Sequence, residues 1–280
     1  PDEATTGDPL YVEVEVADNV GIASVHLDYS FGVGGQSSNI TMDTNGVDAW
    51  GNGTYSLTIT VPHTNESLAI HFACVDTSGN WNVSPIVVLE VVDDDPPFSG
   101  GDLSDTSATT GDPFLLSVDA NDNMGVVSVW ANYRFGTGQV TNLSLDKATW
   151  SSEGIGEWNG TITVADTMEP MTYWFALEDS SGNWNTTPPK QVTVVDDDLP
   201  EIVEDLSLHY AHTGKGYRFA VRVRDNVNVS SVHVLYRFGT EFPTNETMAP
   251  LEVDTTGSGD YERLGLTIPV DATTRLHFAF

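Results

Sequence analysis

The chain has few basic residues and almost no cysteine. Only 10 Lys and Arg stand against 41 Asp and Glu in 280 residues, a formal net charge of −31. Nucleic acid and anionic membranes are excluded as partners because both bind clustered Lys and Arg. The single cysteine, Cys74, excludes an intrachain disulfide and is expected to be a small buried apolar residue. The acidic surface favours solubility and cation binding, and it would equally suit a salty medium.

Membrane-spanning and catalytic signatures are also missing from the sequence. No apolar run is long enough for a transmembrane helix, and no signal peptide is recognisable in this stretch. His-Glu-x-x-His, Gly-x-Ser-x-Gly and phosphate-loop motifs do not occur. Carboxylates that could form a glycosidase pair lie in turns that recur along the chain, which is unusual for an active site. We therefore expect a protein that is not an enzyme, with no direct membrane insertion in this segment.

What the chain does contain is a repeat. Val-Val-Asp-Asp-Asp at 91–95 returns at 194–198, 103 residues later, and Asp-Asn pairs at Asp18, Asp122 and Asp225 keep nearly the same spacing. A fixed period of this length indicates a tandem array. We expect three units, with a first strand missing from the first and a last strand missing from the third, as in a window cut from a longer array. The expected ranges are 1–95, 96–198 and 199–280.

Strand patterns fill each unit. Val127 to Phe135 alternates strictly between apolar and polar faces, and Met171 to Leu177 alternates through Tyr173 and Phe175. About seven such short runs, separated by turn signals and without a helical period, are typical of a two-sheet sandwich. The sequence therefore predicts an all-β protein, a tandem array of three antiparallel immunoglobulin-like β-sandwich domains.

Several motifs of the unit resemble a known group of repeats. They are Thr-Gly-Asp-Pro-Phe at 110–114, Asp-Asn-x-Gly-Val at 122–126, Asp-Ser-Ser-Gly-Asn-Trp at 179–184, and the Tyr-x-Phe-Gly and Val-Val-Asp-Asp-Asp strings. Together they resemble the immunoglobulin-like repeats of large archaeal cell-surface glycoproteins, and the layout is similar to that of cadherin and polycystic-kidney-disease-type repeats. The resemblance covers the whole chain. It implies an extracellular stalk, surface-layer piece or adhesive module whose partners are like subunits or other surface proteins.

The acidic clusters are expected to meet at the joints between units. In an immunoglobulin-like sandwich the first strand enters at the end that bears the B–C and F–G loops, so each aspartate triplet should lie on those loops of the next unit. Calcium takes six to eight oxygen ligands from carboxylates, amide carbonyls and backbone. The alternative is a solvated acidic linker beside ordinary Asx turns. The predicted calcium ligands are Asp93, Asp94, Asp95, Asp122, Asn123, Asp179 and Asn183 at the first joint, Asp196, Asp197, Asp198, Asp225 and Asn226 at the second, and Asp18, Asp76 and Asn80 in the first unit.

Asn-x-Ser/Thr sequons are more frequent than chance would give. They predict N-linked glycans and export, the alternative being Thr-rich strands beside Asn-rich turns. A proline follows the hydroxyl residue at two of them, Asn82 and Asn185, which should weaken these acceptors. The nine sequons begin at Asn39, Asn52, Asn65, Asn82, Asn142, Asn159, Asn185, Asn228 and Asn245.

Two tryptophans are expected on the outer face of one sheet. Trp130 and Trp174 alternate with core positions on strands that neighbour each other in the immunoglobulin arrangement, so they could form a cross-strand pair. Such a pair could be a contact surface for sugars or a neighbouring chain, or simply local packing covered by a glycan. Two functions follow: a glycosylated, calcium-stiffened structural array of a surface layer, sheath or filament, and, as the alternative, an adhesin or carbohydrate-binding array.

Overall fold

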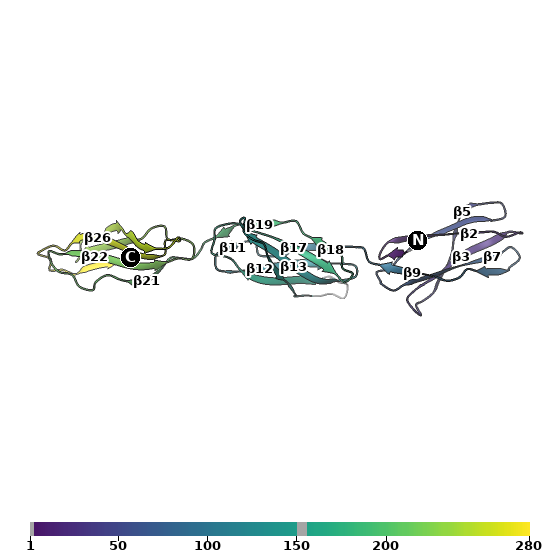
Figure 1. The fold of residues 1–280 in the computed structure, drawn as a ribbon, viewed down its shortest axis with the longest axis horizontal. Coiled ribbons are helices and arrows are strands. Elements are labelled where there is room, and N and C mark those ends of the chain that lie inside the picture. The colour runs from purple at the N-terminus through teal and green to yellow at the C-terminus, as the bar shows by residue number, and fades with distance from the viewer. Residues whose placement is uncertain (1–2, 150–155) are drawn as a thin grey trace.

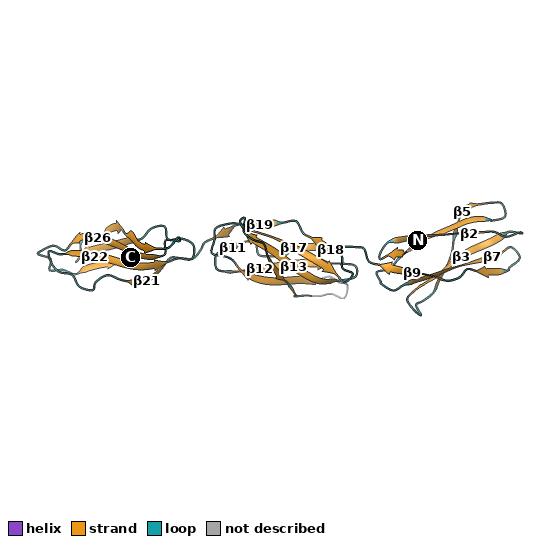
Figure 2. Cartoon of the chain, in the orientation of Figure 1, coloured by secondary structure: helices purple, strands orange, loops and turns teal. Residues whose placement is uncertain are grey.

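In the computed structural model, which describes residues 3–149 and 156–280, three β-sandwiches lie end to end (Figure 1). The regular elements of these residues are all strands, joined by loops and turns (Figure 2). Over the same ranges, therefore, no helix exists that could cross a membrane. The predicted all-β tandem array is confirmed.

The first sandwich consists of a three-stranded sheet, β2-β6-β5, and a sheet in the order β1-β9-β7-β3-β4. A short strand, β8, also pairs with β7, and β1 runs parallel to β9. The strands are β1 (Glu3–Thr5), β2 (Pro9–Val16), β3 (Ile22–Phe31), β4 (Ser38–Thr41), β5 (Asp43–Val47), β6 (Gly53–Thr60), β7 (Leu68–Asp76), β8 (Trp81–Val83) and β9 (Val87–Val92).

The second sandwich has an extra strand on its first sheet. That sheet runs β10-β12-β16-β15, whereas the opposite sheet runs β14-β13-β17-β18 with β19 also on β17, and β11 pairs in parallel with β20. Its strands are β10 (Phe98–Asp102), β11 (Ala108–Thr109), β12 (Pro113–Asn121), β13 (Val126–Phe135), β14 (Thr141–Ser144), β15 (Asp146–Lys147), β16 (Gly156–Thr163), β17 (Met171–Asp179), β18 (Trp184–Thr186), β19 (Lys190–Val192) and β20 (Val194–Val195).

The third sandwich pairs a four-stranded sheet, β21-β22-β26-β25, with a three-stranded sheet, β24-β23-β27. The strands are β21 (Glu201–Asp205), β22 (Gly216–Arg224), β23 (His233–Phe238), β24 (Thr244–Thr247), β25 (Ala249–Val253), β26 (Gly259–Thr267) and β27 (Leu276–Ala279).

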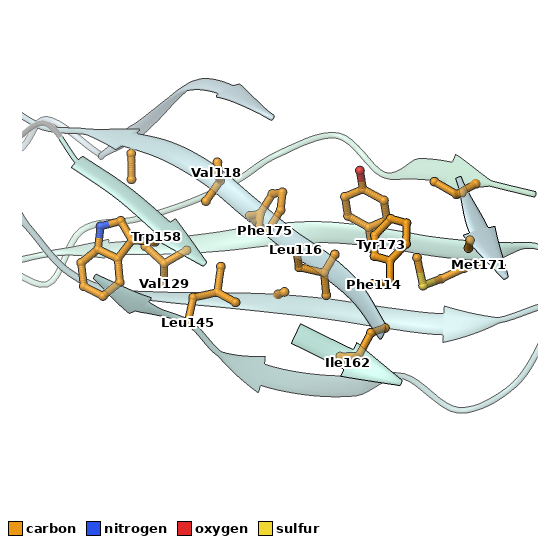
Figure 3. Close-up of a cluster of buried hydrophobic side chains, with 14 of the residues drawn as sticks. Phe114, Leu116, Val118, Val129, Leu145, Trp158, Ile162, Met171, Tyr173 and Phe175 are labelled. Atoms are coloured by element: carbon orange, nitrogen blue, oxygen red, sulfur yellow. The ribbon is translucent and has the colours of Figure 1, made fainter. Parts of the chain in front are cut away.

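Each sandwich encloses its own hydrophobic core, built by the alternation of its strands. In the second unit, Phe114 and Leu116 of β12 face Tyr173 and Phe175 of β17 across the interior (Figure 3). Fully burying one such side chain stabilises the fold by about 1.5–3 kcal/mol. Cys74 packs against the first core but is only half-buried, which corrects the expected full burial.

Candidate metal centre

A tight turn at one end of the second sandwich holds the carboxylate of Asp122. The residue follows β12, and its Oδ1 accepts hydrogen bonds from the backbone N–H groups of Met124 and Gly125, both at 2.7 Å. Gly125 has φ +102°, which favours glycine. Asx turns of this kind form from local sequence alone. This turn uses Oδ1 of Asp122 as its acceptor, so Oδ2 remains available for another partner.

A second turn beside it holds Asp179. This residue ends β17, where it lies opposite Val126 at the start of β13, so the two turns are neighbours. Its Oδ1 accepts hydrogen bonds from the N–H groups of Ser181 and Asn183, both at 2.8 Å, and its Oδ2 accepts one from Asn183 Nδ2 at 2.8 Å. The side chain is 1% exposed. A fully buried carboxylate is thereby fixed next to the turn that carries Asp122.

The linker brings a third carboxylate to this place. Asp93 directly follows β9 of the first sandwich, and its Oδ1 accepts a hydrogen bond from Thr6 Oγ1 at 2.9 Å. Its Oδ2 accepts one from Ser181 Oγ at 2.8 Å, and its backbone oxygen accepts one from Asn183 Nδ2 at 3.0 Å. A single linker residue is therefore bonded to both sandwiches.

The three carboxylates form one cluster, which we call the joint triad: Asp93, Asp122 and Asp179. Each offers an oxygen within 4.8 Å of the others, and all three residues are buried. Within residues 3–149 and 156–280, none of them forms an ion pair with a basic side chain. Two unit charges at this separation repel by about 3 kcal/mol at an effective dielectric constant of 20. The cluster therefore holds substantial uncompensated negative charge.

Two oxygen atoms at the cluster are buried and lack a hydrogen-bond partner in the described chain: Asp122 Oδ2 and Asn123 Oδ1. The amide nitrogen of Asn123 is occupied, since it donates to Thr6 Oγ1 at 3.0 Å and to Asp95 Oδ2 at 2.8 Å. Leaving a buried acceptor unsatisfied costs about 1–3 kcal/mol, and more for a charged group. These buried oxygens have no donor and lie next to two other carboxylates. A bound cation would satisfy them.

Burial and neighbouring charge also raise the pKa of two carboxyls at this joint, those of Asp122 and Asp95. Burial raises the pKa of Asp122, the charges of Asp179 and Asp93 add to this, and the N–H groups of Met124 and Gly125 oppose it. Desolvation likewise raises the pKa of Asp95, with further contributions from Asp8, Asp94 and Asp93, whereas His63 lowers it. The joint therefore destabilises its own negative charge in the absence of a counterion.

The donor set fits a hard cation. The joint triad and the Asn123 carbonyl offer only oxygen, which suits calcium with its six to eight oxygen ligands and variable geometry. Zinc prefers nitrogen and sulfur ligands, and the described residues group no His or Cys with the triad. The protein oxygens here are fewer than a full calcium shell, so water or backbone oxygens would complete it.

Not every residue predicted for this joint is in the cluster. Asp94 and Asp95 are both exposed and lie outside the cluster, although Asp95 Oδ2 accepts a hydrogen bond from Asn123 Nδ2 at 2.8 Å. Asn183 donates from its NH2 group to the backbone carbonyl of Asp93 and to the carboxylate of Asp179, so at this joint it acts as a donor and not as an oxygen ligand. Thr6, which is fully buried and bonded to Asp93, was missed by the sequence analysis although the Thr-Gly-Asp-Pro turn recurs at 110–113.

The second joint repeats the threonine and asparagine contacts of the first, but among the described residues its predicted ligands form no group of three carboxylates. Thr110 Oγ1 donates to Asp196 Oδ1 at 3.1 Å, and Asn226 Nδ2 donates to Thr110 Oγ1 at 3.1 Å and to Asp198 Oδ2 at 2.7 Å. Asn226 Oδ1 is buried without a partner among the residues described, as Asn123 Oδ1 is at the first joint. Asp225 Oδ1 caps its turn by accepting from the N–H groups at 227 and 228. Asp197, like Asp94, is exposed.

The predicted residues of the first unit lie at its far tip. Asp18 Oδ1 accepts hydrogen bonds from two N–H groups of its turn, at 2.7 and 2.9 Å, and Asn19 beside it is exposed. Asp76 accepts from the N–H groups of Ser78 and Asn80, and from Asn80 Nδ2 at 2.7 Å. No linker aspartate of the described residues lies on this tip, and no three-carboxylate cluster forms there.

The outer sheet face of the second unit carries a different tryptophan pair from the predicted one. Trp130 lies opposite Ala176, and Trp174 lies opposite Asn132, so the two tryptophans are diagonal neighbours and not direct cross-strand partners. The Trp130 ring instead stacks on Trp184 of β18, with centroids 5.1 Å apart and planes at 20°. Trp184 is 51% exposed. Trp184 belongs to the three-residue strand β18, which was not predicted from the sequence.

Most sequon asparagines are accessible. Seven of the nine are exposed, whereas Asn52 and Asn159 are half-buried. Three have their amide nitrogen bonded within the described chain: Asn39 to Asp28 Oδ1 at 2.7 Å, Asn52 to Asp48 Oδ2 at 3.3 Å, and Asn185 to the Pro97 carbonyl at 2.9 Å. The bond from Asn185 holds the linker, so a glycan on Asn185 would have to break that hydrogen bond.

Comparison with known proteins assigns no family. No family model matches the chain, and no curated protein matches it. Among solved structures, it is similar to an ICAM-5 D1–D4 ectodomain fragment (TM-score 0.44, 14% identity, covering 100% of this chain and 72% of that one). It is also similar to Rst D1–D2 (0.38, 13%, covering 70% and 94%) and to Clostridium thermocellum CbhA fibronectin(III)-like modules (0.27, 14%, covering 75% and 94%). Every one of these TM-scores is below 0.5, so none assigns a function.

Proposed function

We propose that this chain is part of a non-enzymatic, extracellular structural array, a glycosylated string of immunoglobulin-like units stiffened by calcium at the joint between the first and second units. Such an array would serve as a piece of a surface layer, sheath or filament, with like subunits or other surface proteins as partners. The observation that carries the proposal is the buried joint triad, whose Asp122 Oδ2 has no partner among the described residues. The sequons and the exposure of most of their asparagines support export and glycosylation.

The mechanical role follows from where the ligands originate. Asp93 belongs to the linker after β9, whereas Asp122 and Asp179 belong to two turns of the next sandwich. Domains joined by a short linker otherwise move relative to each other. An ion bound to all three would tie the linker to the second sandwich, and the Thr6 hydrogen bond would tie it to the first. The hinge would then become a rigid connection.

Small-angle X-ray scattering of the purified chain tests this role. With calcium present, the distance distribution should describe a straight rod of three units, as in Figure 1. With chelator, repulsion within the triad should open the first joint, so the average maximum dimension should shorten and the distribution should broaden. Magnesium at the same concentration should restore the rod less well, because its small octahedral shell fits this site poorly. Identical curves in calcium and chelator would contradict the proposal.

A further inference from the structure

We propose that an N-linked glycan on Asn142 lies across the outer face of the second unit's β14-β13-β17-β18 sheet and stacks on Trp174, beside the Trp130–Trp184 pair. The ligand of this aromatic face is then a sugar chain that the protein itself carries. The inference rests on the glycosylation and export in the proposed function, and it is independent of calcium.

The strand register places the sequon and the tryptophan in one row. Asn142 of β14 lies opposite Asn132 of β13, and Asn132 lies opposite Trp174 of β17. Residues next to them in the strands face the core: Ala131 and Phe175 are buried, and Leu143 packs against the same core. Side chains alternate along a strand, so Asn142, Asn132 and Trp174 share the outer face.

The distance across this row suits a short oligosaccharide. Neighbouring strands lie about 4.8 Å apart, so two steps separate Asn142 from Trp174 by roughly 10 Å. A glycan that starts at Asn142 and runs perpendicular to the strands passes over Asn132 before it reaches the Trp174 ring. Asn132 is only 9% exposed, so the glycan passes over a nearly buried amide, and Trp174 is its main contact in this row.

The aromatic groups at the end of the row provide an apolar surface with a polar rim. Trp174 is half-buried, and among the described residues its indole stacks on no other aromatic ring. The stacked rings of Trp130 and Trp184 lie on the same face, and Trp130 is the diagonal neighbour of Trp174. An indole presents a broad apolar face together with one N–H donor, and this combination matches the C–H faces and hydroxyl edges of a sugar ring.

Asn142 is also suited to be an acceptor. It is exposed, and no hydrogen bond of its side chain is recorded among the described residues, whereas the amide nitrogens of Asn39, Asn52 and Asn185 are bonded. Its equivalents in the other units lack the platform. Asn39 faces a row of Asp28 and His71, and Asn245 faces a row of Leu235 and Ala279. The pairing of a sequon with tryptophan is thus specific to the second unit.

Two substitutions of Ser144, the cross-strand neighbour of Trp130, test the proposal while Asn142 and the three tryptophans keep their identity. In a secretory host that adds N-glycans, Ser144→Thr keeps the sequon and Ser144→Ala removes it. Hydroxyl-radical footprinting read by mass spectrometry should show oxidation of Trp174 several-fold higher in Ser144→Ala than in wild type. Ser144→Thr should match wild type, and loss of the Asn245 glycan by Thr247→Ala should leave Trp174 protected.

The reverse experiment follows the glycan. In Trp174→Ala, an endoglycosidase should release the Asn142 glycan faster than in wild type, while release at Asn245 in the same molecule should not change. Equal Trp174 oxidation with and without the Asn142 glycan would overturn the inference, and so would an unmodified Asn142 beside occupied Asn65 and Asn245. If no sequon at all carried a glycan, the glycosylated array of the proposed function would fail as well, so the two failures can be told apart.

Discussion

The tips of the first and second sandwiches have the same turns but different electrostatics. At both tips an aspartate caps the turn after the second strand, Asp18 in one and Asp122 in the other. The loop that follows β7 or β17 also repeats, since Asp76 accepts the N–H groups of Ser78 and Asn80 as Asp179 accepts those of its own turn. Of these two tips, only the second has a linker aspartate on it within the part of the chain that the structure describes.

The pKa values of the turn carboxyls differ between the open tip and the tip that the linker covers. At the open tip, hydrogen bonds from the side chain and backbone of Asn80 lower the pKa of Asp76, as expected for a carboxylate in an Asx turn. At the covered tip, burial raises the pKa of Asp122 although its own two backbone hydrogen bonds remain. The turns therefore form from local sequence at both tips, and at the second tip the linker aspartate joins the two turn aspartates in a candidate ion site.

The largest effect should come from removing the linker carboxylate. Asp93→Ala deletes the group that bridges Thr6, Ser181 and the two other members of the joint triad. Calcium affinity at the first joint should fall by more than the roughly 10–100-fold loss that follows when a residue outside the first coordination shell is replaced. Calorimetric titration measures this loss. Asp94→Ala is the matched control, because it removes the adjacent linker carboxylate, which is exposed. An equal loss of calcium affinity in both variants would refute the assignment.

Neutralising one carboxylate should have opposite effects with and without calcium. Asp122→Asn keeps the oxygen that caps the turn and replaces the unpartnered Oδ2 with an NH2 group. In chelator the variant should be more stable than wild type by about 1–3 kcal/mol, because repulsion from Asp93 and Asp179 is relieved. In calcium it should be less stable. Urea unfolding under both conditions tests this, and Asp18→Asn at the open tip should show no reversal of sign.

The threonine contact should matter less. Thr6→Val removes the hydroxyl that donates to Asp93 and accepts from Asn123, both buried interactions. The free energy needed to open the first joint should fall by about 1 kcal/mol. Hydrogen exchange at the amides of the linker measures it. Thr110→Val should give a similar loss at the second joint, where Thr110 makes the same two contacts; an effect at one joint only would mean that the joints differ.

The smallest effect concerns pH in the absence of calcium. The pKa of Asp76 is lowered, so its contribution to stability is present above the unfolded value near 3.8 and is lost as pH falls through the folded pKa. The pKa of Asp122 is raised, so stability at its tip falls as pH rises through the folded pKa. Carboxyl carbon NMR in chelator should show Asp122 titrating above Asp76. The reverse order would break the comparison between the tips.

The architecture and the meeting of three loops at one joint could be predicted from the sequence because both depend on repeating local patterns. Alternation located the strands, and the immunoglobulin arrangement placed Asp93 over the turns of Asp122 and Asp179. The part played by each linker residue could not be predicted, because it depends on which way each side chain points. Thus Asp94 and Asp197 were included although both are exposed.

Contacts that depend on tertiary register were also missed. Thr6 belongs to a turn whose sequence signalled only a chain reversal, and nothing local shows that its hydroxyl reaches Asp93. Similarly, the outward direction of Trp130 followed from alternation, but its ring partner did not. That partner, Trp184, belongs to a three-residue strand too short to give a periodic signal.

Isothermal titration of calcium into wild type, Asp122→Asn and Asp18→Asn is the most direct test of the ion site. The wild type should bind calcium with a tight site that Asp18→Asn retains and Asp122→Asn loses, since only Asp122 belongs to the joint triad. If the wild type binds no calcium, or if both variants titrate alike, the first joint is no more than a solvated acidic linker.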